Sequence, residues 1–586
     1  MRHIRLSAIL AALLAAAALT ACSDSPAAPT DTTADTTEAV TTPAPEPASL
    51  DLIAGGKTAF TIIRADEAED DSTVELLKKI MNAFDSKAGV RITLGTDWVK
   101  KGTEPNAESY EILVGPTNHP ESAQAMEGVK YRDYVVKMIG NKIVINGHTA
   151  ETRSKAVNYF VTNILGRAEE GKDLVFTEAD NYVSETSYML DTVTLGGVDL
   201  AEYTITYPAD AAYPAQDFAR QLQTILATRS GIYLPIAESA EGKIIAVTVG
   251  DDTAKWSATL KDSTLTCTAG GMWGFDLMYD ALYDTIREAK DTLALENGWS
   301  VSGDITASND DEIARSLTID GDVRVMFHNV WSGAVHNRDD MESSLFLAYM
   351  PDVLGMQEIN PTIRNEKVSL FDLLAPEYTE VPVKVTNKSG NNYTPIVYRA
   401  DRVELIDSGW HLYDDKAGDQ SKSVTWAIFK DKTTGRQFGV ANTHFYWTSD
   451  ALGQSARLID AAEILQVVAD AQAKYPVPFI IGGDLNCRVS AEPQLNLMKG
   501  GWKNAHNTAT GYRSNTKGHH AYAPLDPITN LYSDGPLPSG DYTTAIDHIY
   551  TCGTGVEVRV FNTILHRYAL DSSDHCPIYV DVKFAD

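Results

Sequence analysis

Six short polar motifs in the second half of the sequence carry side chains that suit hydrolytic chemistry. In chain order they are His328-Asn329, Gln357-Glu358, Asn442-Thr443-His444, Gly483-Asp484-Leu485-Asn486, Asp547-His548 and Asp574-His575. Their oxygen-bearing side chains suit Mg²⁺ or Mn²⁺, which take few protein carboxylates and keep several waters. Imidazoles beside carboxylates suit proton transfer and phosphate binding. Together the motifs indicate a site that could bind a divalent metal and a phosphate and could transfer protons.

Each motif taken singly has an ordinary structural explanation. An Asp-His pair is usually part of a surface loop, and Gly-Asp-x-Asn is common in turns and caps. Six such motifs, each beside an apolar run, are much harder to obtain by chance. We therefore expect them to converge on one cleft. Without a metal this cleft would be electronegative, because it would gather four carboxylates, those of Glu358, Asp484, Asp547 and Asp574.

The elements that must position these motifs are short β-rich runs separated by loops. The runs are Val323–Phe327, Val353–Met356, Pro395–Arg399, Val424–Phe429, Phe438–Thr443, Phe479–Gly482, Ile546–Tyr550 and Ile578–Val582. A helix with one apolar face is expected over Ala451–Ala473. Strands in two groups with helices between them predict an α/β (α+β) fold, a four-layer sandwich of two mainly antiparallel sheets flanked by helices.

The segment from Val323 to Phe584 resembles the endonuclease/exonuclease/phosphatase superfamily of metal-dependent phosphoesterases. The resemblance rests on the motifs from Gln357-Glu358 to Ser573-Asp574-His575, which stand in the family's order. It implies a catalytic domain over residues 320–586. It also implies that Glu358 is the principal metal ligand, supported by Asn329 and Asp574, with Mg²⁺ or Mn²⁺ as cofactor.

The same resemblance implies roles for five further residues. Asp484 would orient and activate the attacking water, and Asn486 would hold a phosphoryl oxygen. His575, oriented by Asp547, would contact the scissile phosphate, and His444 would stabilise the leaving oxygen. Such roles fit the needs of phosphoester hydrolysis, which are charge neutralisation, an in-line water and a stabilised leaving group.

Departures from the family pattern leave the substrate open. Thr394 stands where relatives often have Asn, Lys422-Ser423 where they commonly have Arg, and Phe445 where they have Leu. The loop over residues 513–520 is densely cationic and polar, so Arg513 and Lys517 are candidate substrate contacts; otherwise it is a solvated loop. The aromatic pair Tyr446-Trp447 could serve as the exposed loop of a sphingomyelinase-like enzyme, but a pair in this place more often packs in the interior, which is the expectation here.

The sequence pattern of the first half of the chain predicts two small α/β modules. A strand–helix–strand series begins at Phe60 and opens again at Tyr203, which places the modules at residues 50–190 and 191–310. Neither copy contains a group of residues that is typical of a catalytic site. We interpret them as spacers or packing platforms, with glycan or envelope contact as the alternative. The acid-rich stretch Glu288–Asp320 is predicted to connect the second module to the C-terminal segment.

The N-terminus has the pattern of a bacterial lipoprotein signal. Arg2 and Arg5 precede an apolar run, and Leu19-Thr20-Ala21-Cys22 resembles a processing site. We expect a signal peptide over residues 1–22, a lipid on Cys22 and a disordered tether over residues 23–49. The protein would then be extracytoplasmic and held at the cell-envelope membrane. The remaining cysteines, Cys267, Cys487, Cys552 and Cys576, are expected to be buried free thiols.

The charge and the motifs together favour one class of function over two others. The formal net charge of −31 counts against a large non-specific footprint on duplex DNA. The leading interpretation is an extracytoplasmic, Mg²⁺-dependent phosphoesterase that hydrolyses phosphodiesters or phosphomonoesters of a small molecule, a lipid headgroup or a nucleic acid. A secreted nuclease acting on DNA or RNA is the second. The third is a non-catalytic surface-binding lipoprotein.

Overall fold

A computed structural model describes residues 49–66, 72–101, 103–333, 335, 337–414, 417–520, 525–526, 531–532 and 540–585. The predicted signal peptide, Cys22 and all of the predicted tether except Ser49 lie outside these residues. Within the described residues, no helix is both long enough and apolar enough to cross a membrane.

The first module is built on one six-stranded sheet with the strand order β3-β2-β4-β6-β5-β8. The strands are β2 (Thr61–Arg64), β3 (Thr93–Thr96), β4 (Glu111–Val114), β5 (Tyr134–Ile139), β6 (Lys142–Gly147) and β8 (Tyr182–Val183). Buried side chains of α1 (Ser72–Ala88) and α3 (Ala150–Tyr159) share one apolar core with this sheet.

The second module repeats this arrangement strand for strand. Its sheet has the order β12-β11-β13-β15-β14-β17, with the same parallel and antiparallel pairs in the same places. The strands are β11 (Tyr203–Thr206), β12 (Ile236–Ala237), β13 (Lys243–Val249), β14 (Lys255–Lys261), β15 (Thr264–Ala269) and β17 (Ser300–Asp304). Helices α4 (Tyr213–Ser230) and α5 (Met272–Glu288) pack against it. A common origin of the two modules stays a prediction.

The stretch Glu288–Asp320 is not the simple connection that its composition indicates. It contains β16 (Asp291–Leu295), β17 and the helix α6 (Asp311–Leu317). β17 is the edge strand of the second module's sheet and alternates exposed with half-buried residues. An edge strand buries little apolar surface, so its sequence is nearly as polar as a loop.

The C-terminal region contains two further six-stranded sheets. The first has the order β20-β21-β19-β18-β31-β30 and the second the order β22-β23-β24-β25-β29-β26. The first comprises β18 (Val323–Asn329), β19 (Val353–Gln357), β20 (Thr379–Glu380), β21 (Ile396–Tyr398), β30 (Val556–Thr563) and β31 (Ile578–Phe584). The second comprises β22 (Val403–Leu412), β23 (Ser423–Asp431), β24 (Gln437–His444), β25 (Phe479–Asp484), β26 (Lys503–Asn504) and β29 (Asp547–Cys552).

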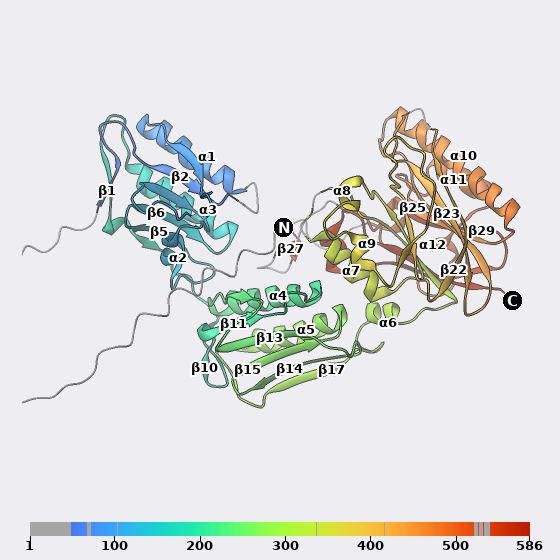
Figure 1. Cartoon of the computed structure of the whole chain (residues 1–586), viewed down its shortest axis with the longest axis horizontal. Helices are drawn as coiled ribbons and strands as arrows, with labels where there is room; N and C mark the ends of the chain where they lie inside the picture. The colour runs from blue at the N-terminus through green and yellow to red at the C-terminus, as the bar shows by residue number, and fades with distance from the viewer. Residues whose placement is uncertain are drawn as a thin grey trace, which may run out of the picture. The chain divides into compact units, whose positions relative to one another are not determined.

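The two sheets form the inner layers of a four-layer sandwich, which confirms the predicted fold class. Apolar side chains from both sheets share one core between them. Helix α10 (Ala451–Lys474) covers the outer face of the second sheet beside α11 (Glu492–Lys499) (Figure 1). Helices α7 (Arg338–Tyr349), α9 (Leu370–Leu374) and α13 (Arg567–Ser572) pack on the first sheet.

Glycines allow the two sheets to approach closely near the ends of their strands. A Cβ on Gly482 of β25 would lie 2.5 Å from Cδ2 of Phe327 in β18, and one on Gly355 of β19 would lie 2.7 Å from Cγ of Asn442 in β24. Such distances leave no room for a side chain. The glycines therefore set the spacing between the strands that carry the polar motifs. The four cysteines predicted to be buried free thiols are confirmed as such.

Candidate active site

Three candidate catalytic residues lie side by side at the end of the second sheet. His444 is the last residue of β24 and is in register with Asp484, the last residue of parallel β25. Asp484 is in turn in register with Asp547, the first residue of antiparallel β29. All three side chains are buried. Residues that are in register on neighbouring strands point to the same face of a sheet, so the three side chains lie next to one another.

The first sheet brings two more residues to the same point. Asn329 ends β18 and pairs in register with Gln357, the last residue of β19, which Glu358 follows directly. The amide Nδ2 of Asn329 donates to Oε1 of Glu358 at 3.2 Å and to Oδ2 of Asp484 at 3.1 Å. Asn329 therefore bridges the motifs of the two sheets.

Glu358 is held in a left-handed backbone conformation, with a φ of 66°. Non-glycine residues adopt this conformation rarely, and often at functional sites. Its Oε2 accepts a hydrogen bond from the backbone N–H of Ser332 at 2.7 Å. Burial would raise the pKa of Glu358, but the charges of His444 and Lys422 and the Ser332 contact lower it overall. The carboxylate is thus kept ionised, as a metal ligand must be.

Buried amides behind the cleft tie the two sheets together. Nε2 of Gln357 donates to Oδ1 of Asn442 at 2.6 Å. Nδ2 of Asn442 donates to the backbone oxygens of Met356 at 2.7 Å and Pro395 at 2.8 Å. These bonds position the residues that follow in sequence, Glu358 and His444, without touching the cleft themselves.

His575 and Asp547 form a hydrogen-bonded imidazole–carboxylate pair. Nδ1 of His575 lies 2.8 Å from Oδ2 of Asp547, and its Nε2 lies 3.8 Å from Oδ2 of Asp484. Burial lowers the pKa of His575, but Asp547 and the neighbouring carboxylates outweigh it and raise that pKa to about 10. His575 is therefore an imidazolium near neutral pH, with Nε2–H directed to the carboxylate side of the cleft.

Asn486 is the second residue of this cleft with a left-handed backbone, with a φ of 50°. Its N–H donates to Oδ1 of Asp484 at 2.8 Å, and its Nδ2 donates to the backbone oxygen of Phe445 at 3.0 Å. The turn after β25 therefore clamps the carboxylate of Asp484 and directs the Asn486 amide towards His444, whose Nε2 lies 3.1 Å away.

A buried lysine belongs to the site although the motifs did not assign it a role. Nζ of Lys422 lies 2.8 Å from Nε2 of His444, and Lys422 is only 4% exposed. Burial lowers its pKa, while Glu358, Asp484 and Asp419 oppose that shift. The available signal was its place before β23, where relatives commonly have Arg.

The oxygen donors around Glu358 fit a hard divalent cation. Oδ1 of Asp574 is buried and has no hydrogen-bond partner among the described residues. An orphaned carboxylate oxygen is costly unless an ion satisfies it. Together with Glu358 it offers carboxylate oxygens, which suit Mg²⁺ or Mn²⁺. Asn329 instead directs Nδ2 to Glu358, and its Oδ1 accepts from the N–H of Trp331.

A second group, Asp484, Asp547 and His575, brings its ligand atoms within 4.8 Å of one another and could also hold a metal ion. His575 already uses Nδ1 in the bond to Asp547. As an imidazolium it has no lone pair to give to a metal. In this protonation state the group suits proton transfer better than metal binding.

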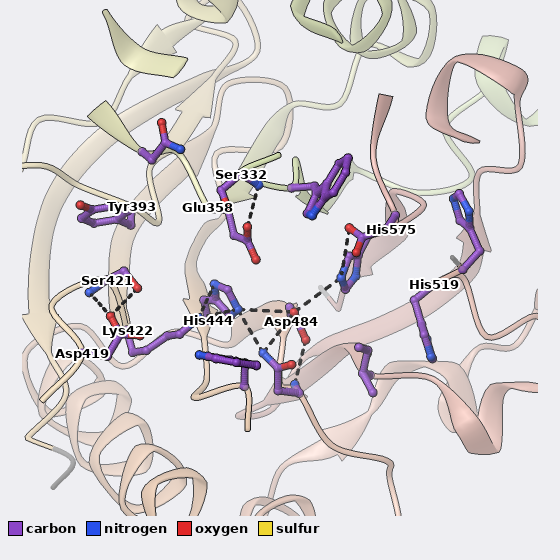
Figure 2. Close-up of a pocket in the computed structure, with 17 residues that line it drawn as sticks. Ser332, Glu358, Tyr393, Asp419, Ser421, Lys422, His444, Asp484, His519 and His575 are labelled. Carbon is purple, nitrogen blue, oxygen red and sulfur yellow. Dashed lines mark hydrogen bonds and ion pairs between the residues drawn. The ribbon is translucent and has the colours of Figure 1, made fainter. Parts of the chain in front are cut away.

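These residues line one pocket of about 600 Å³. Figure 2 shows Glu358, His444 and Asp484 at its centre, with Tyr393, Asp419, Ser421 and Lys422 on one side and His519 and His575 on the other. Trp447 also lines the pocket and is 64% exposed, so the expectation that it packs in the interior is wrong. Trp447 lies in the loop between β24 and α10.

The loop over residues 513–520 reaches the pocket, but with other residues than the two predicted to contact substrate. Its histidines His519 and His520 line the pocket, and its backbone pairs with the segment around His575. Arg513 and Lys517 are not among the described residues that line it. A substrate contact by these two residues stays a prediction.

The C-terminal region is similar to known proteins. Residues 326–575 match the model of the Endonuclease/Exonuclease/phosphatase family. The crystal structure of an endonuclease/exonuclease/phosphatase from Bacteroides vulgatus is 23% identical in sequence to this chain. The match covers 45% of this chain and 98% of that chain, and its TM-score is 0.35. A mannosyl-6-phosphatase from Bacteroides thetaiotaomicron is 18% identical, covering 45% and 100%, with a TM-score of 0.36. The human nocturnin catalytic domain is 18% identical, covering 45% and 94%, with a TM-score of 0.34. No curated protein matches the chain.

Proposed function

We propose that this protein is an extracytoplasmic, Mg²⁺- or Mn²⁺-dependent phosphoesterase. The proposal is supported by the match of residues 326–575 to the Endonuclease/Exonuclease/phosphatase family, whose members are metal-dependent phosphoester hydrolases. It hydrolyses a phosphomonoester or phosphodiester by in-line attack of water on phosphorus. The observation that carries the proposal is the convergence of His444, Asp484 and the Asp547–His575 pair on the pocket that holds Glu358.

Each side chain has a distinct task in this reaction. Asp484 is an ionised carboxylate clamped by Asn486, so it orients the attacking water and accepts its proton. The imidazolium of His575, fixed by Asp547, donates to a non-bridging phosphoryl oxygen. Donors placed where charge develops in the transition state are often the largest catalytic contribution.

The other wall of the pocket serves the leaving group. His444 and Lys422 are in contact, so a proton can be held between them and delivered to the departing oxygen. A metal bound by Glu358 and Asp574, with Asn329 in support, would neutralise charge on the phosphoryl oxygens.

The position outside the cytoplasm rests on the N-terminal sequence. Leu19-Thr20-Ala21-Cys22 supports processing before Cys22 and attachment of a lipid. Incorporation of a labelled fatty acid into the protein in a bacterial host would test this. Label that persists in a Cys22→Ser variant would contradict it.

The activity test uses the purified full-length protein with Mg²⁺ or Mn²⁺. Its substrates are p-nitrophenyl phosphate, bis-p-nitrophenyl phosphate, sphingomyelin, RNA and plasmid DNA. We expect turnover that EDTA and the His575→Ala substitution abolish. A preference for DNA or RNA would favour the nuclease interpretation. A folded protein that binds metal and turns over none of these substrates would contradict the proposal and favour a surface-binding role.

A further inference from the structure

The wall of the pocket opposite His575 has the chemistry of a carbohydrate site. Resting on the proposed function, we infer that the substrate is a phosphomonoester of a sugar hydroxyl. Water attacks phosphorus, the bond between phosphorus and the sugar oxygen breaks, and a proton passes to that oxygen. The products are inorganic phosphate and the free sugar.

The size of the pocket limits what the leaving group can be. A volume of about 600 Å³ lies within the range of small-molecule sites. Lys422 is the only lysine or arginine among the described residues that line it. Binding of a nucleic-acid strand relies on several cations that follow its phosphates. The pocket therefore suits one phosphate on a compact neutral group.

Asp419 places a carboxylate beside the space for the leaving group. The N–H and the hydroxyl of Ser421 both donate to Oδ1 of Asp419, at 2.8 Å and 2.7 Å. The hydrogen bonds of the described residues thus fix this carboxylate through Oδ1, and Oδ2 can accept from a ligand. Figure 2 shows Asp419, Ser421 and Tyr393 on the same side of the pocket as Lys422. A carboxylate accepts hydrogen bonds from sugar hydroxyls, whereas it repels a second phosphate.

Aromatic rings also contribute to the lining of the pocket. Trp331, Tyr393 and Trp447 all line the pocket. Trp331 has a left-handed backbone, with a φ of 54°, and its ring lies so close to Gly333 that a Cβ there would be 2.5 Å from Cζ2. Such a conformation in a large aromatic residue marks a position selected for its ring. A sugar ring offers an apolar C–H face to such rings and hydroxyls to the polar groups at its edge.

The test measures phosphate release by the full-length enzyme from hexose 6- and 1-phosphates, a mononucleotide and propyl phosphate, with Mn²⁺ present. We expect kcat/KM for the better hexose phosphate to exceed that for the mononucleotide by at least about tenfold. The Trp447→Ala substitution should lower the ratio of kcat/KM for hexose phosphate to that for propyl phosphate by about tenfold. Trp98→Ala is the matched control, because Trp98 is 68% exposed and lies in the first module.

A second variant tests the charge of Asp419 independently of the rings. Asp419→Asn should raise kcat/KM for a hexose bisphosphate relative to the monophosphate, since the carboxylate that repels the second phosphate is gone. Asp470→Asn on the exposed face of α10 is its control. Preference for the mononucleotide or for DNA, or unchanged ratios in both variants, would overturn the inference and leave the phosphoesterase proposal intact. Absence of metal-dependent hydrolysis of any phosphoester would overturn both.

Discussion

Nζ of Lys422 lies 2.8 Å from Nε2 of His444 in the wall of the pocket. The same Nε2 lies 3.1 Å from Nδ2 of Asn486 and 3.4 Å from Oδ2 of Asp484. The Lys422–His444 pair therefore lies among groups that can pass a proton to the position proposed for the leaving oxygen.

Loss of this lysine should impair catalysis more than folding. We expect Lys422→Met to lower kcat/KM by about 10²-fold, the usual cost of one donor to a developing charge. Lys422→Arg should recover part of the activity, because it keeps a cationic hydrogen-bond donor at this position. Steady-state kinetics with Mn²⁺ would measure both. Lys474→Met, at a lysine whose side chain is 64% exposed, is the control. An effect below threefold in Lys422→Met would exclude the lysine from the reaction.

The carboxylate that orients His575 gives a second prediction. Asp547→Asn keeps the shape of the side chain but removes the charge that stabilises the imidazolium 2.8 Å away. A related loss in a serine protease costs about 10⁴-fold in kcat, so we expect a fall of about 10²- to 10⁴-fold. Glu463→Gln is the matched control, since Glu463 pairs with His411 at 2.6 Å outside the pocket. Wild-type kcat in Asp547→Asn would show that His575 acts without its partner.

Metal binding should depend on Glu358. Binding to the folded state alone stabilises a protein by about 2.7 kcal/mol when the metal is at 100 times its dissociation constant. We expect Mn²⁺ to raise the melting temperature of the wild-type protein and to have little effect on Glu358→Gln. Calorimetric titration with Mn²⁺ would measure the affinity of each directly. Glu380→Gln, at an acidic residue outside the pocket lining, should bind like the wild type. Equal affinities in all three proteins would place the metal elsewhere.

The strands of the catalytic domain were predictable where they are buried on both faces. All eight runs predicted after residue 320 are strands. β18, β19 and β25 are buried at every position, and their apolar runs stand out from the loops beside them. β22 was missed because it is an edge strand, mostly half-buried, with an irregular register between Leu405 and Asp407. Its period-2 pattern is therefore broken.

The motifs predicted only those residues of the site that lie at the ends of strands. His444, Asp484 and Asp547 meet because of strand register, whereas the sequence showed only that each motif lies beside an apolar run. Lys422 enters the pocket with a buried side chain and Trp447 with an exposed ring. Such burial and exposure depend on tertiary packing, which local sequence does not encode. The substrate side of the pocket was therefore the part that sequence reasoning left open.

The buried ion pair between Arg324 and Asp581 supports the last prediction, which concerns stability. Nε of Arg324 donates to Oδ1 of Asp581 at 2.7 Å and Nη2 donates to Oδ2 at 2.9 Å, joining β18 to β31 beneath the site. Neither side chain is more than 1% exposed. Removal of one partner leaves an uncompensated buried charge, so Arg324→Met should lower the free energy of unfolding by about 3–5 kcal/mol.

Urea unfolding of the full-length protein, followed for the C-terminal transition, would measure this loss. Arg399→Met is the control, because its partner Asp401 is 62% exposed and such pairs contribute about 1 kcal/mol or less. The double variant Arg324→Met with Asp581→Leu should recover much of the stability, since an apolar pair of similar volume removes the stranded carboxylate. If the double variant were as unstable as Arg324→Met, the loss would come from the other hydrogen bonds of Arg324 and not from the unpaired charge. Those bonds go to the backbone oxygens of Arg315, Ser316, Thr318 and Tyr349.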